Sequence, residues 1–344
     1  MERKPKRKRR ERKRFTKKRA AMGLAAALAA YAVYLLSTPK GRRRPVTELS
    51  NALGLDLAYV SWRGVHYAYY LRPGVGRPLV LLHSVHVVAA AHELRPLVQR
   101  LLRETNRPLY VLEWLGFGHS DRPDIPYTAA LLEEQLEHFL ERVVRVDGGA
   151  DVIGLGLGAT YAAAVARRRP ELVRALVALE PAGLAADASA VAESWAQVLL
   201  TLPGVRRAYY DRLTTPEALY EFARDNLFSP EFGVPDEYIE YGTETARVEG
   251  ASRPLDDFLS GRLWPEGGWE LFLHLPQPLL LVHGTVADRR LEPYVEPPAA
   301  LRARPQTEIV ALPTGALPHW ERPGEVTERI VKFLATLPEG VHAA

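Results

Sequence analysis

Short apolar runs that alternate with helical segments constrain the fold of this chain more than any other feature. Each run is nearly continuous in apolar residues, as expected for a strand buried on both faces of a sheet. The expected strands are Pro78–His83, Pro108–Trp114, Asp151–Leu155 and Val173–Leu179. The expected helices cover residues 89–104, 128–146 and 159–169. This alternation predicts the α/β class, with a mostly parallel central sheet and helices on both faces.

Two regions depart from the alternation. Leu57–Trp62 and Val65–Leu71 flank Gly64 and predict a β-hairpin ahead of the parallel strands. Residues 184–275 are rich in aromatic residues and leucine, and prolines divide them into several short predicted helices. Strand patterns then resume at Pro278–His283 and Thr307–Leu312, and a closing helix is expected near the end. A helical insertion inside a resumed sheet predicts a lid rather than an independent domain.

The charges divide the chain into a basic tail and an acidic body. Residues 1–44 hold 17 of the 45 Lys and Arg residues but only two of the 41 Asp and Glu residues. The remaining residues, 45–344, therefore carry a formal net charge of −11. Because phosphate binding needs a basic surface, the folded body is not expected to bind nucleic acid.

The segment 20–38 is predicted to be a transmembrane helix. Ala20–Ser37 contains no charged residue, and as a helix it would span roughly 27 Å, close to the hydrocarbon thickness of a bilayer. Thirteen basic residues precede it and four follow it, which by the positive-inside rule predicts a cytoplasmic N-terminus and an extracytoplasmic body. A cleaved export signal and a soluble basic arm are the two alternatives.

The composition also limits the chemistry. The chain has no cysteine, which excludes disulfides, thiolate catalysis and cysteine-ligated zinc. The sequence contains no His, Asp and Glu cluster at metal-ligand spacing. We therefore expect neither a metal nor a cofactor.

Four short motifs occur in a characteristic order. They are LLHS at Leu81–Ser84, LGFGHSDRP at Leu115–Pro123, GLGLG at Gly154–Gly158 and TGALPHWERP at Thr314–Pro323. Together they resemble the α/β-hydrolase superfamily over residues 55–340. The resemblance implies an α/β-hydrolase fold with a core (57–183 and 276–340) and a helical lid (184–275). The charge and hydropathy patterns add a basic tail (1–19), a transmembrane helix (20–38) and a linker (39–56).

The resemblance also places a Ser-His-Asp catalytic triad, and two of its three positions hold unsuitable residues. The nucleophile position at the strand-to-helix turn is Gly156, and the histidine position is Ala316. Glycine offers no attacking oxygen and alanine no imidazole, so neither can take its part in acyl transfer. Asp288 stands at the acid position. The backbone N–H groups of Val85 and Leu157 are the expected oxyanion hole.

Four other residues could in principle substitute for the missing groups. His319 follows Ala316 by three positions, and Ser84 and Ser120 lie in the first two motifs. Glu180 ends a predicted strand where some family members place their acid. Each also has a structural interpretation, because a hydroxyl can form hydrogen bonds with backbone groups in a turn and a histidine can pack as part of the core.

Two hypotheses follow from the sequence. The first is a membrane-anchored protein without classical hydrolysis, which binds a hydrophobic ligand or a protein partner. The alternative is an active esterase-like or lipase-like hydrolase that uses Ser84 or Ser120 with His319 and Asp288.

Overall fold

The computed structural model describes residues 46–184, 203–286 and 296–338. The predicted tail (1–19), the predicted transmembrane helix (20–38) and Asp288 lie outside the described residues. Within the described ranges, no helix combines the length and the apolar character that crossing a membrane requires.

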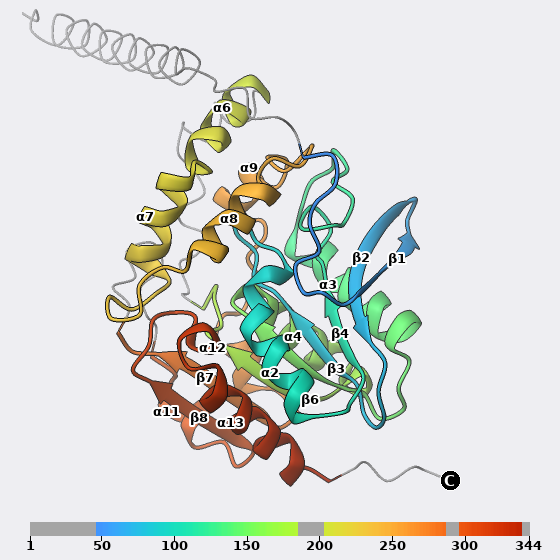
Figure 1. Cartoon of the computed structure of the whole chain (residues 1–344). Coiled ribbons are helices and arrows are strands. Elements are labelled where there is room, and N and C mark those ends of the chain that lie inside the picture. The colour runs from blue at the N-terminus through green and yellow to red at the C-terminus, as the bar shows by residue number, and fades with distance from the viewer. Residues whose placement is uncertain (1–45, 185–202, 287–295, 339–344) are drawn as a thin grey trace, which may run out of the picture.

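One eight-stranded sheet forms the centre of the molecule, in the order β1-β2-β4-β3-β5-β6-β7-β8 (Figure 1). Strands β1 and β2 form the predicted hairpin, β2 pairs antiparallel with β4, and all later neighbours are parallel. The strands are β1 Asp56–Trp62, β2 Val65–Arg72, β3 Leu79–Leu82, β4 Leu109–Leu112, β5 Ala150–Leu155, β6 Val173–Leu179, β7 Leu279–Gly284 and β8 Thr307–Leu312. Each lies close to its predicted position, which confirms the α/β class.

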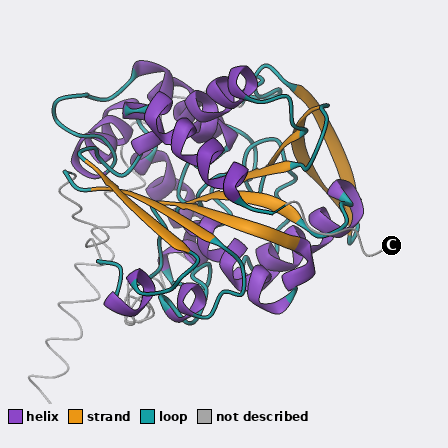
Figure 2. Ribbon diagram, turned by 90° about the horizontal axis from the view of Figure 1, so that it is seen from below, coloured by secondary structure: helices purple, strands orange, loops and turns teal. Residues whose placement is uncertain are grey.

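Helices cover both faces of the sheet, as Figure 2 shows. Because side chains alternate along a strand, Val80 and Leu82 enter one core while Leu79 and Leu81 enter the other. The first core includes residues of α3 and α4, and the second includes residues of α2 and α13. The flanking helices are α2 Arg95–Glu104, α3 Ala129–Phe139, α4 Leu157–Arg168, α11 Ala299–Arg302, α12 Pro318–Glu321 and α13 Pro323–Thr336, with the short η1 Ala91–Leu94, η2 Leu140–Val144 and η3 Pro170–Leu172.

The first helix differs from the prediction. The sequence predicted one helix over 89–104, but the structure has the 3₁₀ turn η1 followed by α2, which begins at Arg95. Pro96 lies in the first turn of α2, where its missing N–H costs nothing. Continuing an α-helix back through this proline would forfeit a hydrogen bond, so the helix is interrupted there.

The insertion, residues 184–275, adds helices between β6 and β7. Its described helices are α6 Pro203–Leu213, α7 Pro216–Asn226, α8 Asp236–Thr245, α9 Leu255–Leu259 and α10 Glu270–Leu273. Thr215 caps α7 by accepting a hydrogen bond from the Ala218 N–H at 3.1 Å. In Figure 1 helices α6, α7 and α8 stand above the ends of the strands, on the side where β3 and β5 end.

Candidate functional site

The turn from β5 to α4 has the shape expected of a nucleophile elbow. Gly156 joins the two elements with φ 56° and ψ −126°, a conformation that side chains rarely adopt. Its N–H donates to the Leu179 carbonyl at 3.0 Å, which fixes the turn against β6. The elbow is therefore formed, but it presents no side chain.

Ser84 fills the space left by that missing side chain. It follows β3, and its hydroxyl oxygen lies where a β-carbon on residue 156 would stand. The Ser84 β-carbon is 2.9 Å from the same position. Because the described structure brings this hydroxyl to the elbow, Ser84 is the one sequence-predicted fallback nucleophile that adjoins Gly156.

A buried carboxylate holds the loop that carries Ser84. Glu93 in η1 accepts the Ser84 N–H at 3.1 Å and bonds the His86 ring, Oε1 to Nε2, at 2.6 Å. Burial acts to raise the pKa of Glu93, but the neighbouring His86 and its hydrogen bond outweigh it and lower the pKa to about 2. Sequence reasoning missed Glu93, although it is the only acid in the apolar stretch between β3 and α2.

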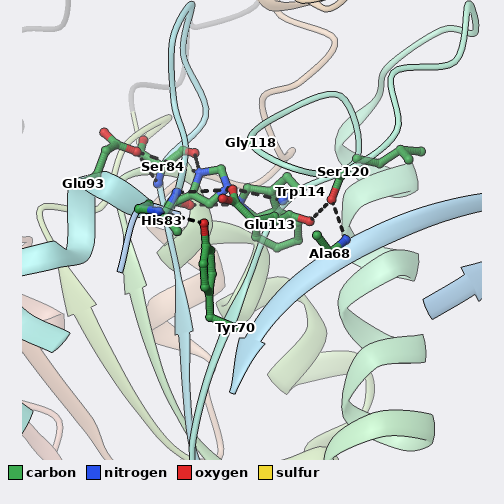
Figure 3. A network of polar contacts seen from close by, with 12 residues as sticks. Ala68, Tyr70, His83, Ser84, Glu93, Glu113, Trp114, Gly118 and Ser120 are labelled. Carbon is green, nitrogen blue, oxygen red and sulfur yellow. Dashed lines mark hydrogen bonds and ion pairs between the residues drawn. The ribbon is translucent and has the colours of Figure 1, made fainter. Parts of the chain in front are cut away.

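His83 is fully buried beneath the same loop, and both of its ring nitrogens have partners (Figure 3). Nδ1 donates to the Ser84 carbonyl at 2.6 Å, since a carbonyl can only accept. Nε2 accepts the Trp114 N–H at 3.2 Å and lies 3.1 Å from a Glu113 carboxylate oxygen. These contacts make His83 a structural residue that links β3 to the end of β4.

Ser120 also has a structural position. Its hydroxyl donates to the Glu113 carbonyl at 2.8 Å and accepts the Ala68 N–H at 2.9 Å (Figure 3). The residue is 1% exposed and connects β2 to the turn after β4. The hydroxyl thus both donates and accepts a structural hydrogen bond. These contacts do not support the prediction that Ser120 is a fallback nucleophile.

His319 is buried away from the role of a base. Its Nε2 lies 2.7 Å from the Glu93 carbonyl and must donate to it, and the Trp320 indole donates to the same oxygen at 2.6 Å. Burial lowers the pKa of His319 to about 4, against the raising effect of the bond to Glu93. Its Nδ1 has no partner among the described residues, and the ring packs as a structural histidine.

The remaining triad positions add no base. Ala316 follows β8 and is partly exposed. Glu180, a fallback acid, directly follows β6 with φ 45°, and its carboxylate accepts the Gly284 N–H at 2.8 Å, which connects the end of β6 to β7. The structure therefore brings Ser84 and Gly156 together, whereas His319 and Ser120 hold other parts of the core.

The expected oxyanion groups lie beside the elbow. Val85 directly follows Ser84, and Leu157 directly follows Gly156, and both residues are buried. Leu157 is the first residue of α4, and N–H groups in the first turn of a helix have no acceptor within that helix.

A separate groove of about 590 Å³ runs along α3 and α4. It contains neither Gly156 nor Ala316. Its walls combine apolar groups with three arginines and two glutamates. The lining residues are Thr128, Ala129, Ala130, Glu133, Ala164, Arg167, Arg168, Arg262, Trp264, Glu266 and Leu271.

Comparisons with known proteins agree with this architecture. The family model described as "Alpha/beta hydrolase family" matches residues 79–329. Two solved structures have a similar fold. A serine hydrolase involved in carbazole degradation has a TM-score of 0.64 at 21% identity and covers 81% of this chain and 98% of its own. A probable hydrolytic enzyme from Pseudomonas aeruginosa has a TM-score of 0.63 at 21% identity, covering 82% and 95%.

Curated relatives match over shorter regions. The 2-hydroxy-6-oxo-6-(2'-aminophenyl)hexa-2,4-dienoic acid hydrolase of Metapseudomonas resinovorans is 30% identical over 119 residues, which are 34% of this chain and 40% of that protein. The human 1-acylglycerol-3-phosphate O-acyltransferase ABHD5 is 38% identical over 82 residues, 23% of each chain. The chain thus spans less than half the length of these relatives. With the fold, the elbow and the family match in agreement, this chain belongs to the alpha/beta hydrolase family.

Proposed function

We propose that this protein binds a ligand or partner through a hydrolase fold that has lost the family's route of hydrolysis. The supporting observation is Gly156, which keeps the elbow conformation but offers no attacking atom. Ala316 at the histidine position provides no proton acceptor. Losing triad members lowers turnover by about 10⁴–10⁶-fold, so the same route would be physiologically negligible.

The test is covalent labelling of the purified full chain with a fluorophosphonate, together with turnover of a small chromogenic ester. We expect no labelling and an ester rate at the buffer background. Labelling of the wild-type chain would overturn the proposal. Its loss in Ser84→Ala, but not in Ser120→Ala, would identify the attacking residue.

One observation favours a second candidate function, an active hydrolase with a relocated nucleophile. The Ser84 hydroxyl occupies the space beside the elbow, next to the expected oxyanion groups. His86, held by the buried carboxylate of Glu93, is the nearest imidazole to Ser84 in sequence with an exposed edge, at 16%. To serve as the base it would have to release the Val88 N–H, which its Nδ1 accepts at 3.4 Å, and His86→Ala would then abolish labelling.

We propose that the ligand is an amphipathic anion and that the groove along α3 and α4 receives it. Trp264, Leu271 and the groove alanines supply apolar contact, and Arg167 forms no carboxylate ion pair within the described residues. The Trp264 indole N–H is buried and has no hydrogen-bond partner among the described residues. Isothermal titration calorimetry with laurate should show binding to the wild-type chain, and Arg167→Ala and Trp264→Phe should each weaken it. Variants that bind laurate with the wild-type affinity would contradict this site.

We further propose that residues 20–38 anchor the protein in a membrane, with the N-terminus in the cytoplasm and the body beyond the bilayer. The uncharged segment and the excess of basic residues before it support this topology. Cell fractionation with a high-salt wash should leave the full chain in the membrane pellet. Recovery of a soluble chain that begins after residue 38 would instead indicate a cleaved export signal.

A further inference from the structure

The segment before β1 connects two parts of the molecule that are distant in sequence. Residues 46–55, which we term the N-terminal strap, lie between the sheet and the insertion. Val46 forms a parallel bridge with Val248, just beyond α8. Leu49 and Ala52 are 8% and 3% exposed and belong to the core that also contains Tyr241 of α8. The strap is therefore packed, and it is held by apolar burial as well as by polar contacts.

On the insertion side, one carboxylate receives two bonds from the strap. The Ser50 N–H donates to Glu244 Oε1 at 2.7 Å, and the Ser50 hydroxyl donates to Oε2 at 2.6 Å. The Tyr241 hydroxyl returns a bond to the Ser50 carbonyl at 3.0 Å. Ser50 thus makes three bonds to two residues about one turn apart on α8, and the two bonds to Glu244 are charge-assisted.

On the core side, the next residues of the strap bond to the sheet and α2. The Ala52 N–H donates to the Tyr70 hydroxyl of β2 at 3.2 Å, and its carbonyl accepts from Arg95 Nε at 2.8 Å. Arg95 also pairs with Glu237 on α8 at 3.0 Å. The strap and Arg95 together join α8 to the core.

Helix α8 in turn contacts the loop beside the elbow. The His92 ring of η1 stacks on Tyr241 at 4.8 Å between centroids and lies 5.1 Å from the Tyr238 ring. The next residue in η1 is Glu93, whose carboxylate holds the Ser84 N–H and His86. A continuous set of contacts therefore runs from Ser50 through α8 and η1 to Ser84.

We propose that the N-terminal strap clamps α8 over the loop of residues 84–88, so that releasing the strap loosens α8 and this loop together. A pull on the chain before Val46, from a bound ligand or from membrane attachment, would then break the contacts of Val46 and Ser50 with the insertion before those of Ala52 with the sheet. The proposal is independent of whether the chain hydrolyses esters, because it concerns only how these elements are held.

Hydrogen exchange of the full chain, followed by mass spectrometry, tests the clamp. Glu244→Ala removes both acceptors of Ser50, and we expect the amides of residues 236–245 and 84–94 to exchange about tenfold faster or more. Ser50→Ala removes only the hydroxyl bond and should give a smaller increase in the same peptides, which keeps the test available if Glu244→Ala does not fold. Glu240→Gln is the matched control, since Glu240 is an exposed acid on the same helix.

Three outcomes would overturn the proposal. If residues 236–245 exchange at the wild-type rate in both Glu244→Ala and Ser50→Ala, the strap does not hold α8. Faster exchange in α8 without a change in residues 84–94 would break the link to the loop. An equal increase in β5 and β6 would indicate global destabilisation in place of a local clamp.

Discussion

The Ser84 hydroxyl occupies the position that a β-carbon on Gly156 would need. The two residues come from different strand ends, Ser84 after β3 and Gly156 after β5. The hydroxyl of the facing loop therefore takes up space that a side chain at the elbow would use. A side chain at position 156 therefore requires the Ser84 side chain to move.

The first prediction concerns this pair. Gly156→Ser should lower the free energy of unfolding by about 2–4 kcal/mol, because overpacking against Ser84 adds to the strain of a side chain at positive φ. Adding Ser84→Gly should recover the overpacking part of that loss. Urea unfolding of the two single variants, the double variant and the wild type measures the coupling. Losses that simply add would show that the two sites do not compete for space.

The second prediction tests the structural role of Ser120. Ser120→Ala leaves the buried Ala68 N–H without its acceptor, so we expect a loss of about 1–3 kcal/mol in the free energy of unfolding. Ser61→Ala on the exposed face of β1 is the control and should change it by less than about 0.5 kcal/mol. Equal effects of the two changes would argue against the proposed bridge between β2 and the turn after β4.

The third prediction concerns Glu93. Its two carboxylate oxygens accept from the Ser84 N–H and bond His86. Glutamine has one carbonyl oxygen and one NH₂ group, so Glu93→Gln cannot keep acceptors for both the Ser84 N–H and the His86 ring. We expect a loss of about 1–3 kcal/mol in the free energy of unfolding and faster exchange of the Ser84 amide. Glu104→Gln, on the exposed end of α2, controls for a change of charge. A Ser84 amide that exchanges at the wild-type rate would contradict this role.

The parallel strands could be predicted from the sequence because burial on both faces leaves a direct mark. Leu79–Leu82 alternates between two cores, and each core demands apolar residues, so the whole strand becomes apolar. The interruption before α2 could have been predicted too, since Pro96 marks it. Its signal was weaker than the helical pattern around it.

The candidate site was only partly predictable. GLGLG identifies the elbow, because its conformation requires a residue that tolerates positive φ. The partners of Ser84 could not be read from spacing, since Glu93 reaches it through the path of η1. Similarly, the distance from His319 to Glu93 depends on how α12 packs against η1, which no local pattern specifies. The sequence identified chemical types, and tertiary packing decided which of them meet.

The last prediction is an acid lability caused by two buried histidines. Burial lowers the pKa of His92 to about 3 and that of His319 to about 4, whereas both return to about 6.5 in the unfolded chain. The unfolded state therefore binds more protons as the pH falls below about 6.5, and the stability that is complete above this value is progressively lost. Between about pH 6 and pH 4.5 the two groups together should remove about 2–3 kcal/mol per pH unit.

His92→Phe should reduce that slope to about one proton, or about 1.4 kcal/mol per pH unit. The phenyl ring can replace the imidazole against Tyr238 and Tyr241, because neither His92 nitrogen has a hydrogen-bond partner among the described residues. Urea unfolding at several pH values measures the slope, and His274→Gln serves as the control because that ring is 62% exposed and largely surrounded by water. If His92→Phe unfolds with the wild-type slope, His92 does not bind the additional proton on unfolding, and the acid lability must come from other groups.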